Sequence, residues 1–143
     1  MARVSEKARV PATPEHAWKT ASDLSRLGEW LSLHEGWRGE LPDEITEGTE
    51  LISVVTVKGL RNRINWRVEV MNAPEELRIS GKGVGGVKVT LDLSIRPDGS
   101  GSTVAFDAEI TGPPTIGPMG LVIGRALRGD VRKSVKALAE LVA

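Results

Sequence analysis

The chain has 143 residues, the length of one domain, and its 19 Lys and Arg balance 19 Asp and Glu, so the formal net charge is zero. With 40% hydrophobic and 27% charged residues, the composition argues against a disordered chain and against a membrane-spanning one. The absence of cysteine excludes disulfide scaffolds, thiolate metal sites and cysteine nucleophiles. Residues 1–7 lack the apolar core of a signal peptide, so we expect a single cytoplasmic domain over residues 1–143.

The start of the chain predicts a strand followed by two short helices. Residues 3–10 alternate between two kinds of side chain, which is the period of a half-buried strand, and Glu6 falls on its inward face. Thr13 followed by Pro14 predicts the start of a helix, with Thr13 as the N-cap. A second cap at Asp23 predicts another short helix directly after the first.

The middle of the chain predicts an antiparallel meander. From Gly48 onward apolar residues recur at every second position, and turns rich in Gly, Pro and Asn separate the runs. The expected apolar runs of these strands are residues 51–57, 64–70, 77–81, 87–95 and 104–110.

The last part of the chain predicts one long amphipathic helix that begins between Ile116 and Met119 and runs to the end. Its apolar side must cover the sheet, because the chain offers no other partner for it. A strongly curved antiparallel sheet wrapped around this helix gives an α+β fold class. The expected inner positions are Ile123, Leu127, Val131, Ser134, Leu138 and Leu141, and the opposite side carries a basic stripe of Arg125, Arg128, Arg132 and Lys136.

One stretch is the most distinctive in the sequence: VPATPEHAW at residues 10–18, followed by Asp23 and then by Glu29-Trp30. Together with the order of elements, it resembles the START-like or Bet v 1-like helix-grip superfamily, in particular the polyketide cyclase/dehydrase and lipid transport branch. The resemblance covers essentially the whole chain, and some short actinobacterial members of similar size are labelled as toxins of toxin–antitoxin pairs. It implies a cavity between the sheet and the long helix that holds an apolar ligand, but it implies no single reaction.

The residues themselves also favour a cavity. Small inward side chains alternate with larger ones, and the chain has four Trp, one Phe and no Tyr with which to fill its interior. Three of the tryptophans are expected to be flat walls of this cavity, with a plain core role as the alternative. His34 lies between two of them, near the expected entrance. The predicted ligand-binding residues are Trp30, His34, Trp37, Ser53, Val55, Trp66, Leu91, Phe106, Ile123 and Leu127.

Polar groups that could carry chemistry are scarce in this interior. Glu6 and Asp130, which flanks the apolar side of the long helix, are the candidate polar cavity groups, with a solvent-facing position as the alternative for both. A polyketide cyclase/dehydrase-type enzyme would need one of them, or His34, as an internal acid or base. We assign no catalytic residue, and the sequence favours binding or transport of a small hydrophobic ligand, lipid-like or polyketide-like, over catalysis.

Other kinds of chemistry find little support in the motifs. The two histidines lack metal-ligand spacing and no G-x-S-x-G is present, so we expect no metal, no cofactor and no hydrolase triad. Residues 81–86 match G-x-G-x-x-G, but a strand pattern follows where a nucleotide site needs a helix, which indicates a flexible hairpin. With so few aromatic residues for base stacking, a nucleic-acid partner is not expected.

Two surface features suggest protein partners. The basic stripe could meet phosphate, an acidic partner or anionic lipid headgroups, and a solvated helix face is the alternative. Ile52 and Val54 make the run 51–57 apolar on both faces, so a homodimer contact there is a further alternative. The last functional alternative is the toxin of a two-gene pair, which would act through a protein or nucleic-acid partner and bind an antitoxin.

Overall fold

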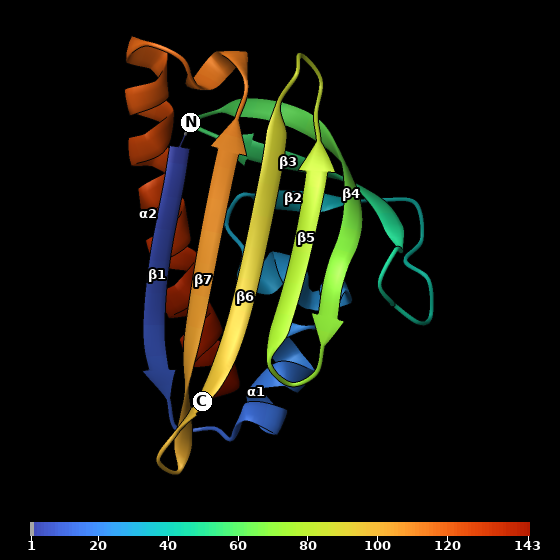
Figure 1. The fold of residues 1–143 in the computed structure, drawn as a ribbon, viewed down its shortest axis with the longest axis vertical. Coiled ribbons are helices and arrows are strands. Elements are labelled where there is room, and N and C mark those ends of the chain that lie inside the picture. Colours follow the sequence, from blue (N-terminus) through green and yellow to red (C-terminus); the bar gives the residue numbers. More distant parts are fainter. Residues whose placement is uncertain (1) are drawn as a thin grey trace.

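A seven-stranded antiparallel sheet curls around one long C-terminal helix (Figure 1). The computed structural model describes residues 2–143. The strand order is β1-β7-β6-β5-β4-β3-β2, so the first strand of the chain pairs with the last. This architecture confirms the predicted α+β helix-grip fold. The elements are β1 (Ala2–Val10), α1 (Pro14–Ala21), the 3-10 helix η1 (Leu24–Glu29), β2 (His34–Arg38), β3 (Glu50–Val57), β4 (Leu60–Asn72), β5 (Glu76–Lys82), β6 (Lys88–Asp98), β7 (Gly101–Thr111), the 3-10 turn η2 (Pro113–Thr115) and α2 (Pro118–Val142).

The two short helices after β1 start at the predicted caps. The Thr13 side chain caps α1 by accepting a hydrogen bond from the His16 N–H at 3.3 Å, and the Asp23 side chain caps η1 in a similar way. η1 is a 3-10 helix, not a regular α-helix. Its two buried residues, Leu24 and Leu27, are three positions apart, and three residues per turn is the period of a 3-10 helix.

Strand β2 has no counterpart in the sequence prediction. It is five residues long, it pairs antiparallel with β3, and a bulge interrupts its register between His34 and Gly36. Its sequence, HEGWR, shows no apolar alternation, so the pattern alone indicates a loop. β2 is an edge strand that places Trp37 against η1, where the indole N–H donates a hydrogen bond to the Leu24 carbonyl at 2.7 Å.

Helix α2 packs mainly against β1 and β7, behind them in the view of Figure 1. Two small side chains of these strands, the half-buried Ala8 and the fully buried Ala108, let the helix approach this half of the sheet closely. The inner face differs from the prediction in two respects. Val135 is buried as well, and Val142 is buried in place of Leu141, which is only half-buried, because the last step along the inner face spans four residues. The buried face of α2 is Ile123, Leu127, Val131, Ser134, Val135, Leu138 and Val142.

Candidate functional site

The interior between the sheet and α2 is a continuous apolar cluster. Trp30, at the end of η1, stands edge-on to Phe106 of β7, with ring centroids 5.6 Å apart and planes at 84°. Both rings are buried. The same cluster contains most of the ligand-binding residues predicted from the sequence, so the fold brings them together: Trp30, Val55, Trp66, Leu91, Phe106, Ile123 and Leu127.

Most polar groups within or beside this cluster have partners. The Trp66 indole donates a hydrogen bond to the Ser53 hydroxyl at 2.7 Å, and both residues are buried. The Ser102 and Ser134 hydroxyls donate to backbone carbonyls at 2.8 and 2.6 Å. The Trp30 indole is different: among the described residues its N–H has no hydrogen-bond partner, although the side chain is only 4% exposed. A buried donor without a partner costs about 1–3 kcal/mol, so an acceptor atom that reached this N–H would remove that cost.

His34 and Trp37 lie together on β2, beside this interior. Their rings are 4.7 Å apart and tilted by 54°. Burial lowers the pKa of His34 below its ordinary value, because the charged imidazolium would lose its hydration there. Burial therefore favours the neutral form of His34 over the charged one at this edge strand.

The two candidate polar cavity groups lie at the border of the interior. Glu6 points inward from β1 but reaches Arg132 on the outer side of α2, at 3.6 Å, with about a third of its side chain exposed. Asp130 is half-buried, and burial raises its pKa, while a hydrogen bond from the Ser32 hydroxyl at 3.1 Å opposes that shift. The structure thus places Glu6 at a wet edge of the sheet and Asp130 in a contact between α2 and the segment before β2.

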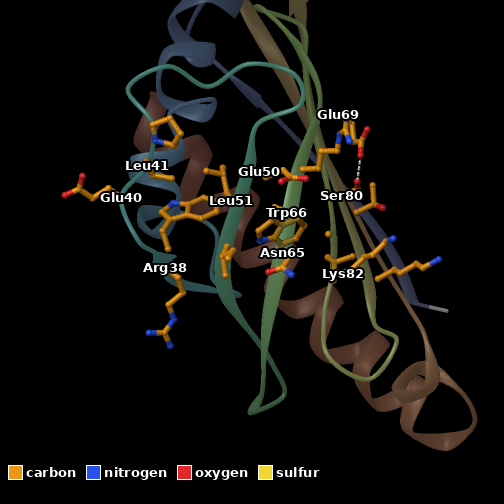
Figure 2. A pocket seen from close by; sticks show the side chains of 18 residues that line it. Arg38, Glu40, Leu41, Glu50, Leu51, Asn65, Trp66, Glu69, Ser80 and Lys82 are labelled. Carbon is orange, nitrogen blue, oxygen red and sulfur yellow. Dashed lines mark hydrogen bonds between the residues drawn. The ribbon is translucent and has the colours of Figure 1, made fainter.

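The sequence reasoning missed a broad hollow of about 810 Å³ across β2 to β6 (Figure 2). It is lined mostly by the outward-facing rows of these strands, and among the described residues none of α2 lines it. One cross-strand row runs from Arg38 through Ile52 and Asn65 to Lys82 and Lys88, as the strand registers place them side by side. Figure 2 shows Arg38 and Lys82 on opposite sides of the hollow, with Asn65 between them.

The charged side chains that line this hollow differ in whether they have an ion-pair or hydrogen-bond partner. Four lining cations, Arg38, Arg67, Lys82 and Lys88, have no ion-pair partner among the described residues. Of its carboxylates, Glu69 accepts a hydrogen bond from the Ser80 hydroxyl at 2.7 Å (Figure 2). The sequence signal for this hollow is the set of polar residues at outward-facing strand positions, which the prediction of an apolar cavity does not include. Trp37 and Trp66 also border this hollow, and Ile52 lies half-buried within it.

A second hollow of about 440 Å³ lies over β1, β7 and β6, and again no described residue of α2 lines it. Its wall includes Asp92, which binds Arg78 at 3.2 Å. The neighbouring Glu76 shares a hydrogen bond with Asp92, and this contact, together with burial, raises the pKa of Glu76. Both hollows lie on the outer side of the sheet, away from α2, although buried residues of the interior cluster also border them, Trp66 in the first and Phe106 in the second.

Neither a cluster of metal ligands nor a membrane-spanning helix is present among the described residues. No group of His, Asp and Glu comes close enough together to hold a metal ion. None of the described helices combines the length and the hydropathy that crossing a membrane requires, and this includes α2 with its 25 residues.

The amino-acid sequence is similar to a known family and to known proteins along nearly its whole length. The whole chain, residues 1–143, matches the family described as "Polyketide cyclase / dehydrase and lipid transport". Two proteins of Mycobacterium tuberculosis are each 45% identical to it. "Uncharacterized protein Rv1546" matches over 141 residues, 99% of both chains, and "Toxin Rv0910" matches over 136 residues, 95% of this chain and 94% of the other.

Solved structures share the fold at lower identity. A START superfamily protein from Mycobacterium smegmatis superimposes with a TM-score of 0.76 at 20% identity, covering 99% of this chain and 97% of that one. The protein TTHA0849 from Thermus thermophilus gives a TM-score of 0.79 at 22% identity, covering 98% and 96%. At such identities the likeness concerns the fold alone.

Proposed function

The chain belongs to the polyketide cyclase/dehydrase and lipid transport family, and on that basis we propose that it binds a small hydrophobic molecule. The ligand occupies the interior between the sheet and α2, beside Trp30 and Phe106. One observation carries this proposal: the buried Trp30 N–H lacks a partner in an interior that is otherwise apolar or satisfied. A ligand with an apolar body and one hydrogen-bond acceptor matches this environment, because most of its binding free energy then comes from buried apolar area.

In this proposal the ligand enters where the segment between η1 and β2 meets α2. The contacts at this border are polar: the Ser32 N–H donates to the Ser134 hydroxyl at 2.9 Å, and the Ser32 hydroxyl reaches Asp130 at 3.1 Å. Hydrogen bonds of this kind contribute only about 0.5–1.5 kcal/mol each, so they hold the border closed while allowing it to open. Ser134→Ala removes the central acceptor and should speed ligand uptake.

The test compares two probes of similar size, 2-acetylnaphthalene and 2-ethylnaphthalene, by calorimetric titration. The first carries a carbonyl acceptor and the second does not. We expect the wild type to prefer 2-acetylnaphthalene by roughly tenfold, and Trp30→Phe to abolish that preference while keeping the ring. Trp66→Phe is the matched control, because its N–H already has a partner. Failure of both probes to bind, or an unchanged preference in Trp30→Phe, would contradict the proposal.

A second candidate function follows from the relative named as a toxin, which is 45% identical over 136 residues. Under this hypothesis the protein arrests the growth of the cell that expresses it, and an antitoxin inhibits it by binding. The test is induced expression in a related host, with growth as the readout. Arrest by the wild type that persists in Trp30→Phe favours the toxin function independently of the ligand. Unimpaired growth argues against it.

The enzymatic alternative has weaker support in the geometry. The groups that would serve as acid or base are Glu6, Asp130 and His34, and each lies at the border of the interior. Glu6 is engaged by Arg132, and Asp130 accepts from Ser32. A reaction in the interior would need one of them beside the bound ligand, so we favour binding or transport over catalysis.

A further inference from the structure

The large hydrophobic side chains that the protein exposes gather at one end of the molecule. They belong to three segments that are far apart in the sequence: the β3–β4 turn, the β5–β6 hairpin, and the chain that leads into α2 with its first turns. Among the described residues, all the exposed large hydrophobic side chains belong to these segments: Leu60 (55% exposed), Val84 (75%), Ile116 (72%), Met119 (51%), Leu121 (75%) and Val122 (41%).

The three segments lie side by side. Asn62 exchanges two hydrogen bonds with the backbone of Val84, at 3.2 and 3.0 Å, which joins the start of β4 to the β5–β6 hairpin. Gly86 of the same hairpin lies against Pro113, just before α2. Both figures place the two hairpins and the start of α2 at the same end, uppermost in Figure 1 and lowermost in Figure 2. We call these three segments, residues 56–63, 82–88 and 112–128, the apolar–cationic end.

The charged residues of these three segments are all positive. Its three segments contain seven Lys and Arg and no Asp or Glu, while the rest of the chain carries 12 Lys and Arg against all 19 Asp and Glu. All seven cations are exposed, and among the described residues only Arg61 has an ion-pair partner, Glu35 at 2.9 Å. The seven cations are Lys58, Arg61, Arg63, Lys82, Lys88, Arg125 and Arg128.

We propose that the apolar–cationic end docks onto the surface of an anionic lipid bilayer. Exposed apolar side chains surrounded by lysine and arginine suit the boundary between acyl chains and headgroups, where the apolar groups insert and the cations meet phosphate. A second copy of the chain fits less well, because a two-fold contact through this end would set seven cations against seven. Docking is peripheral, since none of the described helices is suited to span the bilayer.

The inference goes beyond ligand binding and stands on different residues. Lys82 and Lys88 lie opposite each other on β5 and β6 and also line the 810 Å³ hollow, so the docking end adjoins this hollow.

The experiment is co-sedimentation of the full chain with vesicles of phosphatidylcholine alone and of phosphatidylcholine mixed with phosphatidylglycerol. We expect binding to the mixed vesicles only, weakened by salt. The double variant Lys82→Gln with Lys88→Gln should lose about fivefold in affinity for each charge removed. Lys133→Gln with Lys136→Gln, exposed on α2 outside this end, is the matched control and should bind as the wild type does.

A second pair tests the apolar component: Val84→Ser with Leu121→Ser should weaken binding by about tenfold with the charge unchanged. Equal binding to both kinds of vesicle, or no binding to either, overturns the proposal, as does a wild-type dimer in solution that Val84→Ser dissociates. Trp30→Phe should bind vesicles normally, so this proposal and the ligand-binding proposal can fail separately.

Discussion

At the scale of single residues, two buried tryptophans differ in one hydrogen bond. Trp30 and Trp66 are 4% and 3% exposed, but only Trp66 donates its N–H, to Ser53. Replacing Trp66 by Phe leaves the Ser53 hydroxyl in the core without this hydrogen bond, whereas replacing Trp30 by Phe removes a donor that was already unpaired. We therefore expect Trp66→Phe to lower the free energy of unfolding by about 1–3 kcal/mol more than Trp30→Phe does, as measured by urea denaturation. Equal losses would contradict the assignment of Trp30 as the unpaired donor.

His34 should make stability depend on pH. Burial lowers its folded-state pKa below the ordinary value of 6.5, so the unfolded chain takes up a proton first as the solution is acidified. Stability should therefore fall as the pH drops from about 6.5 toward the lower folded pKa, and it should be recovered above that range. His34→Gln should flatten this part of the profile of unfolding free energy against pH. His16→Gln, at an exposed site on α1, is the matched control.

At the scale of elements, the close packing of β5 against β4 depends on one glycine. A Cβ at Gly81 would lie 2.8 Å from the Trp66 ring and would also collide with the Ile64 side chain, both of them buried in the core. Overpacking of this kind costs about 1–3 kcal/mol, so Gly81→Ala should lower the thermal midpoint clearly. Gly36→Ala in β2 meets no atom within 4 Å and should change it little.

The elements also show how far sequence reasoning reaches. The strands with regular alternation and the capped helices were predicted, since each carries its own local signal. β2 was not, because a five-residue strand with a bulge at its second residue has no period to detect. The 3-10 form of η1 and the inner position of Val142 depend on how these segments pack, which local patterns do not specify.

The candidate site was predictable only in part. Inward alternation identified the apolar residues of the interior, and the fold gathers them into one cluster. The unpaired Trp30 N–H could not be foreseen, because a hydrogen bond that is missing depends on every neighbour of the indole. The hollow over β2 to β6 depends on strand registers that bring Arg38, Lys82 and Lys88 into one row, and residues so distant in sequence give no local sign of it.

At the scale of the whole molecule, zero net charge conceals a strong separation of charge. One end carries seven cations without a carboxylate in its segments, and the excess of negative charge lies elsewhere. A cation-exchange resin at pH 7 should therefore retain the protein, because a local patch and not the net charge governs its adsorption. Lys82→Gln with Lys88→Gln should elute at distinctly lower salt than Lys133→Gln with Lys136→Gln, although both variants have the same net charge. Identical elution would show that the patch does not act as a unit.

The pairing of β1 with β7 has a consequence for the making of the protein. Val10 is matched to Ser102 and Ala2 to Ile110, so β1 is translated long before β7, the strand with which it pairs. At about 5–20 residues per second, its apolar face waits on the order of 5–20 s in the nascent chain. Chaperones that shield emerging hydrophobic segments would have their clearest target in this protein at its N-terminal strand.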